Sequence, residues 1–484
     1  MEEWFLKSSD LKKYPHFDSV LTRAEAVAIA TDKGLVTAHT FYPFLLYEQR
    51  WNRFAPKGER GKSKTRPIRY AARRDAYIFA YYRHILSGKY EVALKSLGLD
   101  QCVLAYRRTM TSSGGGKCNI HFAQDAFLKV QTLGNCYAIA LDISQYFESL
   151  DHARLKQLWA RMLDVPRLPS DHFQVFKAIT SYAVVDKIEA YQRLGHIGPK
   201  QTSSAGKQIN GYLTAFKKMP KQLCTGREFQ QKIAGQGELK SIIRKNRKPY
   251  GIPQGAPISD LLANLYLLDF DLAIQKKMQA VGGAYFRYSD DILLIGPGGE
   301  TEAKELLTYT QTLVTKFGDE LEIKDKKTSV LVFETSGEFQ TFKLVYGTQG
   351  RNGLEYLGFR YDGQRVFLRD STISNLRRKV ARAARRNANI CAQLHANKGA
   401  SELRLVFNYE RLTKQFGRVE DFPELQHDYR NWTFWTYAKR AAKIFGAAGN
   451  SILRQLRNHR KLVIYRADKE LKRAVQRRDG SGLL

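Results

Sequence analysis

The stretch from Ala284 to Gly296, AYFRYSDDILLIG, places two adjacent carboxylates inside a run of apolar and aromatic residues. Strand-forming residues lie on both sides of Ser289-Asp290-Asp291, which predicts a β-hairpin with the acidic pair at its tip. Two neighbouring anions repel each other unless a cation lies between them. A solvated Asp-Asp turn is the alternative, because acidic residues favour turns for local reasons.

A second candidate strand, YAIAL, ends at Asp142, and residues that suit a turn into a helix follow it. A carboxylate at the end of a buried strand is costly unless it is paired or bound to a metal. If Asp142 faces Asp290 and Asp291, three carboxylates converge, as two divalent ions about 3.5–4 Å apart require. These three residues are therefore a candidate two-metal centre.

The charge of the chain points to its partner. Lys and Arg number 79 against 47 Asp and Glu, a formal charge of +32 over 484 residues. Residues 371–484 hold 25 Lys or Arg and only 9 Asp or Glu. An excess of this size predicts a polyanionic partner, and the interleaved aromatic residues favour nucleic acid over a membrane surface.

Cysteine usage and hydropathy indicate the compartment. The five cysteines form no CxxC pair, so neither a disulfide framework nor a zinc ribbon is expected. No apolar run approaches the roughly 18 residues that a membrane span needs. We expect a reduced, cytoplasmic protein.

Two further segments are candidates for nucleotide contacts. From Pro56 the chain is Gly- and Lys-rich and loop-like, and helical spacing begins at Arg73. Such a basic loop can close over phosphates, although solvated charge is the alternative; its candidate contacts are Lys62, Lys64, Arg66 and Arg69. A second loop, Gly251 to Pro257, precedes a predicted long amphipathic helix, and its Gly255 leaves room for a base pair or sugar. The intervening region, from about 153 to 248, is predicted to be mostly helical.

A basic helix is predicted to begin near Ser371. Leu376 and Val380 lie on one face, and five arginines occupy the remainder, a pattern suited to tracking a duplex backbone. A solvated basic face is the alternative.

In order along the chain, these segments resemble the conserved blocks of reverse transcriptases, with spacing similar to that of the bacterial retron and group II intron branch. Asp142 with Phe147, then GIPQGAPISDLLANLYL, then YSDD resemble the third, fourth and fifth blocks. KTRPIRYAARRDAYIF looks like the first block, and YRR with GKCNIHFAQDAF loosely resembles the second. LEIKDKKTSVL resembles the block that carries a conserved lysine, and LEYLGFRYDG resembles the primer-grip hairpin.

The resemblance implies an α+β right-hand polymerase. Residues 1–136 would form an N-terminal extension and fingers, and residues 137–370 a palm with a ferredoxin-like split sheet and a helical insertion at about 153–250. Residues 371–484 would form a helical thumb and a basic α-helical C-terminal region.

The resemblance also assigns roles to residues. Asp142, Asp290 and Asp291, with the backbone carbonyl of Ile143, would hold two Mg²⁺ ions for an in-line nucleotidyl transfer. Phe147 would lie beneath the sugar and exclude a 2′ hydroxyl.

The remaining implied contacts surround the incoming dNTP. Gln254 and Gly255 would line the nascent pair, and Lys64 and Arg66 would contact the triphosphate. Lys327 would donate a proton to the leaving pyrophosphate, with Lys324 and Lys326 as neighbours that could serve instead.

Within this family the chain looks most like the stand-alone bacterial reverse transcriptases of antiphage defence, which copy a neighbouring noncoding RNA. This implies an RNA template, a DNA product and dNTPs as partners, with homo-oligomers as an option. An intron- or retron-type enzyme without a defence role is one alternative. A maturase-like RNA-binding scaffold is another. Viral RNA-dependent RNA polymerases resemble the chain less, because they usually carry GDD and a Ser-Gly-rich loop.

Overall fold

The computed structural model describes residues 4–52, 63–201, 208–417 and 433–480. Lys62, one of the predicted phosphate contacts, lies outside the described residues.

The centre of the chain is an antiparallel five-stranded sheet in the order β11-β10-β3-β9-β8, here called the palm sheet. Both predicted acidic segments belong to this sheet. The YAIAL segment lies in a strand that ends at Asp142, and the predicted hairpin turns at Ser289 and Asp290. The strands are β3 (Cys136–Asp142), β8 (Ala284–Tyr288), β9 (Asp291–Pro297), β10 (Ser329–Ser336) and β11 (Phe339–Gly347).

Helices cover both faces of the palm sheet, which explains why its central strands are almost continuously apolar. Alternate residues of β3 point to opposite faces. Ala138 packs in one core with α4 (Asn119–Leu133), whereas Ile139 packs in another with α10 (Leu268–Ala280) and α11 (Glu300–Thr315).

The predicted long helix after Pro257 is two helices, α9 (Ser259–Tyr266) and α10. The interruption falls at Leu267, whose backbone leaves the helical region. Both helices pack against the core beneath the palm sheet, so the break redirects the chain without exposing its apolar face.

The N-terminal part contains a second sheet in the order β2-β1-β4-β7, which the sequence did not predict. The Lys-rich segment forms strand β2, paired with β1 along its length, so the predicted loop over residues 63–70 is wrong. Helix α3 (Arg73–Ser96) begins at the predicted residue. The strands are β1 (Phe44–Asn52), β2 (Ser63–Tyr70), β4 (Ala183–Asp186) and β7 (Arg244–Lys245).

The region 153–248 is also less helical than predicted. Besides β4 and β7 it contains the hairpin β5 (Ile197–Gln201) and β6 (Gln208–Tyr212). Leu45 of β1, Val185 of β4 and Tyr191 of α7 share a small core of their own. The helices are α5 (His152–Leu163), α6 (Ser170–Thr180), α7 (Lys187–Arg193) and α8 (Gly226–Glu228), and α1 (Arg23–Thr31) and α2 (Lys33–Ala38) precede them in the chain.

The predicted primer-grip hairpin is a three-stranded sheet, β12 (Leu354–Tyr356), β13 (Phe359–Tyr361) and β14 (Val366–Leu368). It leads into α12 (Asp370–Leu394), which begins within one residue of the predicted start and buries Leu376 and Val380 as expected.

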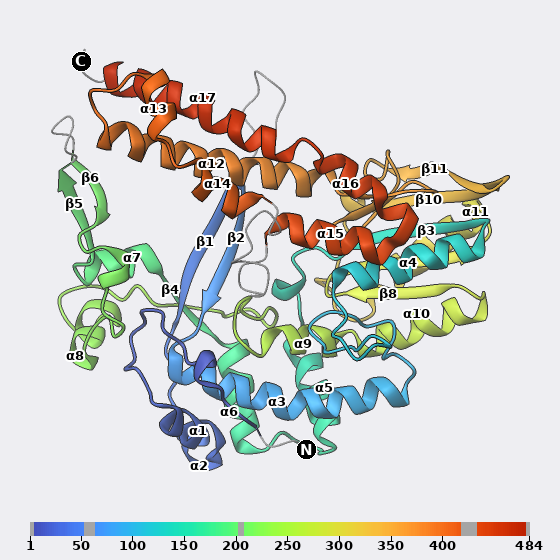
Figure 1. Cartoon of the computed structure of the whole chain (residues 1–484). Helices are drawn as coiled ribbons and strands as arrows, with labels where there is room; N and C mark the ends of the chain where they lie inside the picture. Colours follow the sequence, from blue (N-terminus) through green and yellow to red (C-terminus); the bar gives the residue numbers. More distant parts are fainter. Residues whose placement is uncertain (1–3, 53–62, 202–207, 418–432, 481–484) are drawn as a thin grey trace.

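Helices continue to the end of the described chain, and the expected α+β class with a helical C-terminal extension is confirmed. They are α13 (Ala400–Val406), α14 (Tyr409–Phe416), α15 (Phe434–Phe445), α16 (Asn450–Leu456) and α17 (His459–Gly480). Figure 1 shows α12 and α17 packed side by side along one edge of the molecule. Of the helices described, none is long and apolar enough to cross a membrane.

One hydrophobic core joins the palm sheet to these helices. Ala138 and Leu293 of the sheet, Phe359 of β13, Val380 of α12 and Leu471 of α17 belong to the same buried cluster. The three-stranded sheet therefore fills the space between the palm and the C-terminal helices.

Candidate active site

The palm sheet brings the three predicted carboxylates to one end of two neighbouring strands. Asp142 is the last residue of β3 and lies opposite Asp291, the first residue of β9, in the antiparallel register. The backbone N–H of Ile143 donates to the Asp290 carbonyl at 3.1 Å, which ties the hairpin tip to the end of β3. Ser289, which precedes the pair, adopts a left-handed conformation with φ 61°. Strand register thus brings together residues that are far apart in the sequence.

Lys327 lies in the same place. Its ammonium group donates a short hydrogen bond to Oδ1 of Asp142. The short helix η5 (Asp325–Lys327) is fixed there because the N–H of Lys324 donates to the Asp142 carbonyl at 3.1 Å. Of the three lysines at this position, Lys327 is therefore the one whose side chain bonds to a predicted metal ligand.

Both carboxyl groups at the hairpin tip, Asp290 and Asp291, have raised pKa values. The pKa of Asp291 is raised to about 7, first because the carboxyl group is partly removed from water and then because Asp290 and Asp142 lie close by. Removal from water and the charge of Asp142 also raise the pKa of Asp290. Lys327 only partly offsets this repulsion. The site therefore favours an added positive charge.

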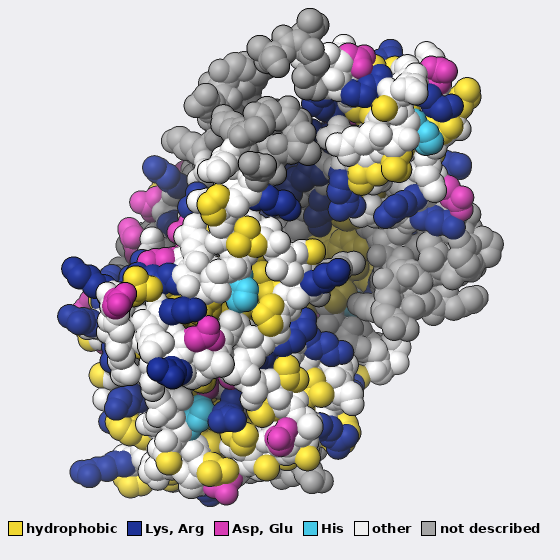
Figure 2. Space-filling model, turned by 90° about the vertical axis from the view of Figure 1, so that its left-hand side faces the viewer, with side chains coloured by type: hydrophobic (Ala, Val, Ile, Leu, Met, Phe, Trp, Pro, Cys, Tyr) yellow, Lys and Arg dark blue, Asp and Glu magenta, His cyan; other side chains and the backbone are white. Residues whose placement is uncertain are grey.

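A cleft of about 490 Å³ opens above these residues. Asp142, Asp291 and Lys327 line its floor, and Lys64 of β2 reaches it from the N-terminal sheet. Figure 2 shows Lys and Arg side chains bordering a recess between the upper and lower parts of the molecule. The cleft thus combines acidic groups on its floor with basic groups on its walls, as a site for a metal-bound polyanion requires.

The far wall of this cleft combines Arg378, one of the five arginines predicted to track a duplex backbone, with residues that the sequence reasoning missed. Arg369, immediately before α12, pairs with Glu355 of β12 at 2.5 Å, and Asn375 and Arg378 of α12 lie beside them. The resemblance covered the segments on either side of Arg369 but assigned it no role. A lone Arg between a strand and a helix gives no pattern by which it could have been found.

The predicted nucleotide loop, Gly251 to Pro257, lies between β2 and the turn that carries Phe147. The Ile252 N–H donates to the Phe147 carbonyl at 2.7 Å, and the Arg69 N–H donates to the Gln254 carbonyl at 2.9 Å. A Cβ at Gly255 would stand 2.6 Å from the Arg69 carbonyl oxygen, so only glycine fits there. The loop and β2 therefore form one continuous surface.

Arg69 reinforces this surface through its side chain. Its guanidinium pairs with Glu148 at 3.0 Å, next to Phe147. Arg66 lies on the same face of β2 as Lys64, since strand side chains alternate, and its charge lies near the hydroxyl of Tyr106. The roles predicted for Arg66, Phe147, Gln254 and Gly255, and for the Ile143 carbonyl, stay predictions.

The three carboxylates are of a ligand type that suits divalent cations, although they do not surround one common point. Among the residues described, no three Asp, Glu, His or Cys side chains are gathered closely enough to hold a metal ion as they stand. Carboxylate oxygens are nevertheless the ligands that Mg²⁺ prefers. The Lys327 ammonium already occupies Asp142 as a cation would. Asp142, Asp290 and Asp291 thus offer the ligand type that a divalent ion takes, at the ends of neighbouring strands.

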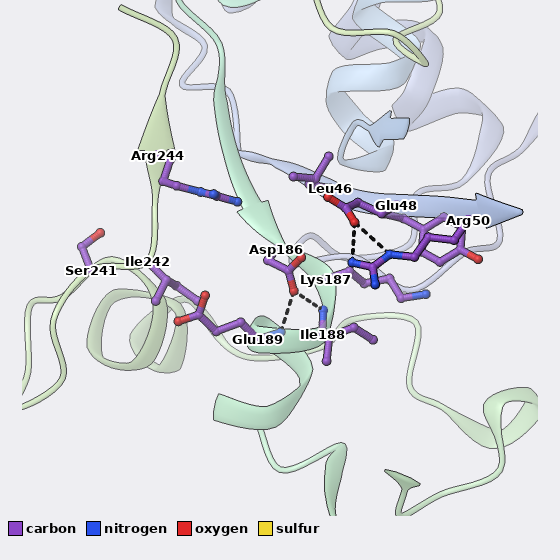
Figure 3. Close-up of a pocket in the computed structure, with 11 residues that line it drawn as sticks. Leu46, Glu48, Arg50, Asp186, Lys187, Ile188, Glu189, Ser241, Ile242 and Arg244 are labelled. Carbon is purple, nitrogen blue, oxygen red and sulfur yellow. Dashed lines mark hydrogen bonds and ion pairs between the residues drawn. The ribbon is translucent and has the colours of Figure 1, made fainter. Parts of the chain in front are cut away.

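A cavity of about 760 Å³ lies elsewhere, on the outer side of the N-terminal sheet (Figure 3). Several of its charged side chains are already bonded. Arg50 pairs with Glu48 at 2.7 Å, and Asp186 accepts hydrogen bonds from backbone N–H groups in the first turn of α7. Among the described residues that line it, Glu189 also pairs with an arginine, Arg193, at 3.6 Å, so each carboxylate there already has a partner. The smaller cleft at Asp142 is therefore the candidate active site.

Residues 208–361 match the family model described as reverse transcriptase (RNA-dependent DNA polymerase). The match is shorter than half of the chain and includes the nucleotide loop, Asp290, Asp291 and Lys327, whereas Asp142 lies before it. No curated protein matches the sequence.

Solved structures with some similarity include telomerases. The apo telomerase of Candida tropicalis truncated from its C-terminal domain is 11% identical, with 66% of this chain and 57% of that chain covered and a TM-score of 0.37. The apo telomerase of the same organism is 12% identical, with coverage of 90% and 62% and a TM-score of 0.38. The telomerase of Candida albicans in complex with a TWJ fragment of telomeric RNA is 11% identical, with coverage of 92% and 62% and a TM-score of 0.35. The chain thus spans less than two thirds of the length of each.

The family match covers the hairpin that carries two of the three carboxylates and the loop beside it. The chain therefore contains a reverse transcriptase domain, the catalytic domain of RNA-directed DNA polymerases.

Proposed function

We propose that this protein is a reverse transcriptase that copies an associated noncoding RNA into DNA by two-metal nucleotidyl transfer, in antiviral defence. The observation that carries the polymerase part is the register that sets Asp142 opposite Asp291, with Asp290 between the strands. In the proposed arrangement, residues 1–136 supply the fingers, residues 137–370 the palm, and residues 371–484 the thumb and a basic C-terminal region.

Asp142, Asp290 and Asp291, with the Ile143 carbonyl, would hold two Mg²⁺ ions. Bound Mg²⁺ activates the primer 3′ hydroxyl and neutralises the triphosphate of the incoming nucleotide. The protein mainly positions the substrates and neutralises their charge. Lys64 lies across the cleft from the carboxylates, where it can contact phosphate oxygens. Lys327, once released from Asp142, is close enough to the same place to protonate the leaving pyrophosphate.

The nucleotide loop would read the geometry of the nascent pair. Gln254 and Gly255 are fixed against β2, and Phe147 lies on the other side of the loop. A ring in this position would clash with a 2′ hydroxyl and so favour deoxynucleotides. Arg66 would add a second cationic contact to the triphosphate.

The finer parts of the proposal, the noncoding template and the antiviral role, depend on the resemblance to stand-alone bacterial reverse transcriptases. The basic arginines of α12, which begins at the cleft wall, suit the backbone of an RNA–DNA duplex. Sequencing of the nucleic acid that copurifies with the protein, with and without dNTPs and phage, tests both parts. Recovery of random host transcripts with the protein would contradict a dedicated template.

A maturase-like RNA-binding scaffold is the second candidate, because the basic surface alone could hold RNA. The Asp290→Ala, Asp291→Ala double variant separates the two. We expect loss of primer extension on an RNA template and loss of phage protection, with RNA binding retained. The Asp319→Ala, Glu320→Ala variant removes the same charge from an adjacent exposed pair and should keep both activities. Retained protection in the first variant would favour the scaffold.

A further inference from the structure

A fully buried ion pair lies directly behind the hairpin tip. Arg287 of β8 and Asp271 of α10 are both 0% exposed. The guanidinium uses two nitrogens, Nε and Nη2, each 2.6 Å from a different oxygen of Asp271. This bidentate arrangement fixes the plane of the guanidinium as well as its position.

Of the other hydrogen bonds of Arg287, one reaches the acidic turn and two reach Asn264. Nη1 donates to the Ser289 carbonyl at 3.2 Å and to the side-chain oxygen of Asn264 at 3.1 Å. Nη2 donates to the Asn264 carbonyl at 3.1 Å. Ser289 is the left-handed residue immediately before Asp290, so Arg287 holds the backbone on which the catalytic pair is mounted.

The partners of Arg287 are themselves anchored. Asp271 accepts a third hydrogen bond, from the Tyr285 hydroxyl at 2.6 Å. Asn264 of α9 donates to the Ala105 carbonyl at 2.7 Å and accepts from the Tyr90 hydroxyl at 3.2 Å. The group of Arg287, Asp271 and Asn264, here called the bracket, therefore connects the hairpin to two helices and to the segment before α4.

Stability alone does not account for such a group. Removing two charges from water is costly, and well-packed apolar residues of similar volume often replace a buried ion pair without loss of stability. What an apolar replacement cannot supply is a donor to the Ser289 carbonyl. Left-handed backbone at a non-glycine residue costs about 1–2 kcal/mol and persists only where its surroundings hold it.

We propose that Arg287 is a positioning residue of the active site, whose bracket holds the Ser289 turn so that Asp290 and Asp291 face Asp142. The proposal rests on the proposed function for its catalytic readout. Groups behind metal ligands typically change metal affinity or activity by about 10–100-fold when they are removed.

Arg287→Lys tests the proposal, because lysine keeps the charge but cannot reach Asp271, Asn264 and Ser289 together. We expect kcat for primer extension to fall by about 10²-fold, since a displacement of about 1 Å at reacting groups has this effect. KM for the primer–template should stay nearly constant. Arg73→Lys is the matched control: Arg73 is also 0% exposed and bonded to Asp18 and backbone carbonyls, in the N-terminal part of the chain. It should lose stability and keep its kcat.

A second variant separates positioning from folding. Arg287→Met with Asp271→Leu removes both buried charges, so the thermal unfolding temperature should be no lower than that of Arg287→Lys. The same 10²-fold loss of kcat is expected, because the tether to Ser289 is gone. A stable double variant with wild-type kcat would overturn the proposal.

Mn²⁺ binding, followed by the loss of the free-ion EPR signal, gives a readout that needs no catalysis. We expect Arg287→Lys to weaken binding by about 10-fold or more and Arg73→Lys to leave it unchanged. Equal binding in these two variants would refute the positioning role. If the wild type binds Mn²⁺ more tightly than Arg287→Lys but extends no primer, the proposed function fails and the bracket stands.

Discussion

Replacing Gly255 with Ala should move strand β2 away from the proposed nucleotide site. Gly255 has φ 115° and no room for a side chain: its Cβ would lie 2.6 Å from the Arg69 carbonyl oxygen, where ordinary contacts begin at 3.4 Å. The backbones must therefore separate by about 0.8 Å. The obstacle is main chain of β2, which is held by the hydrogen bond from Arg69 to Gln254 and cannot rotate away as a side chain would.

The cost of this separation falls on substrate binding. A shift of β2 carries Lys64 and Arg66 with it, and a misplacement of about 1 Å can cost about 10²-fold in rate. We expect kcat/KM for dNTPs in primer extension to fall by about that factor, mainly through KM because the carboxylates on the palm sheet do not move. The strained backbone should also lower the free energy of unfolding by about 1–2 kcal/mol.

Gly98→Ala is the matched control. Gly98 follows the end of α3 with φ 66° and has no atom within 4 Å of its added Cβ, so Gly98→Ala carries the backbone strain without the collision. It should lose about 1 kcal/mol of stability and keep its kcat/KM. Equal losses of kcat/KM in the two variants, or none in Gly255→Ala, would refute the reasoning.

Two further predictions concern sugar selection and pH. Phe147→Ala should raise ribonucleotide incorporation relative to deoxynucleotides by about 10–100-fold, the range of a single steric contact, in competitive primer extension; unchanged selectivity would remove Phe147 from the gate role. Asp291 has its pKa raised to about 7 from an ordinary 3.8, so the folded protein keeps a proton that the unfolded chain has released. Without divalent cations, stability should therefore fall as pH rises from about 4 to 7. Asp291 is exposed to solvent on part of its surface, so we expect screening to limit the fall over this pH range to about 1 kcal/mol. Denaturant unfolding in EDTA measures this fall in the free energy of unfolding. The Asp291→Asn variant should lack the contribution of Asp291, and an equal fall in both proteins would contradict the raised pKa.

Apolar patterning was sufficient to locate the strands that carry the carboxylates. β3 is buried on both faces and β9 is apolar from Ile292 onward, so each reads as a short continuous run bounded by acidic residues. That Asp142 would lie opposite Asp291 could not be predicted from pattern alone. Register between strands so far apart in sequence depends on the whole sheet, and only the resemblance to a family suggested it.

The N-terminal sheet was missed for a physical reason. β2 is an edge strand, and edge strands tolerate the polar residues and the proline that make SKTRPIRY look like a loop. Its conformation is imposed by pairing with β1, where Pro67 lies opposite Glu48. Local propensity carries no information about such a partner.

The bracket, in contrast, left a signal in the sequence. Tyr285 and Arg287 alternate with their neighbours along β8, before the acidic pair, which places them on one face. An arginine in an otherwise apolar strand, on a face that is to be buried, requires an acidic partner. The sequence does not say that this partner is Asp271, because helix and strand meet only in the folded chain.

The single core that runs from the palm sheet through the three-stranded sheet to α12 and α17 has a mechanical consequence. Closely packed interiors resist compression and shear, so the catalytic floor and the arginine-bearing wall should travel as one rigid body. The N-terminal sheet, whose strands β1 and β4 also contribute to a small separate core, lies on the other side of the cleft. The wall formed by α12 would then stay fixed against a bound duplex. Any adjustment as the duplex advances along the template would fall to the N-terminal sheet.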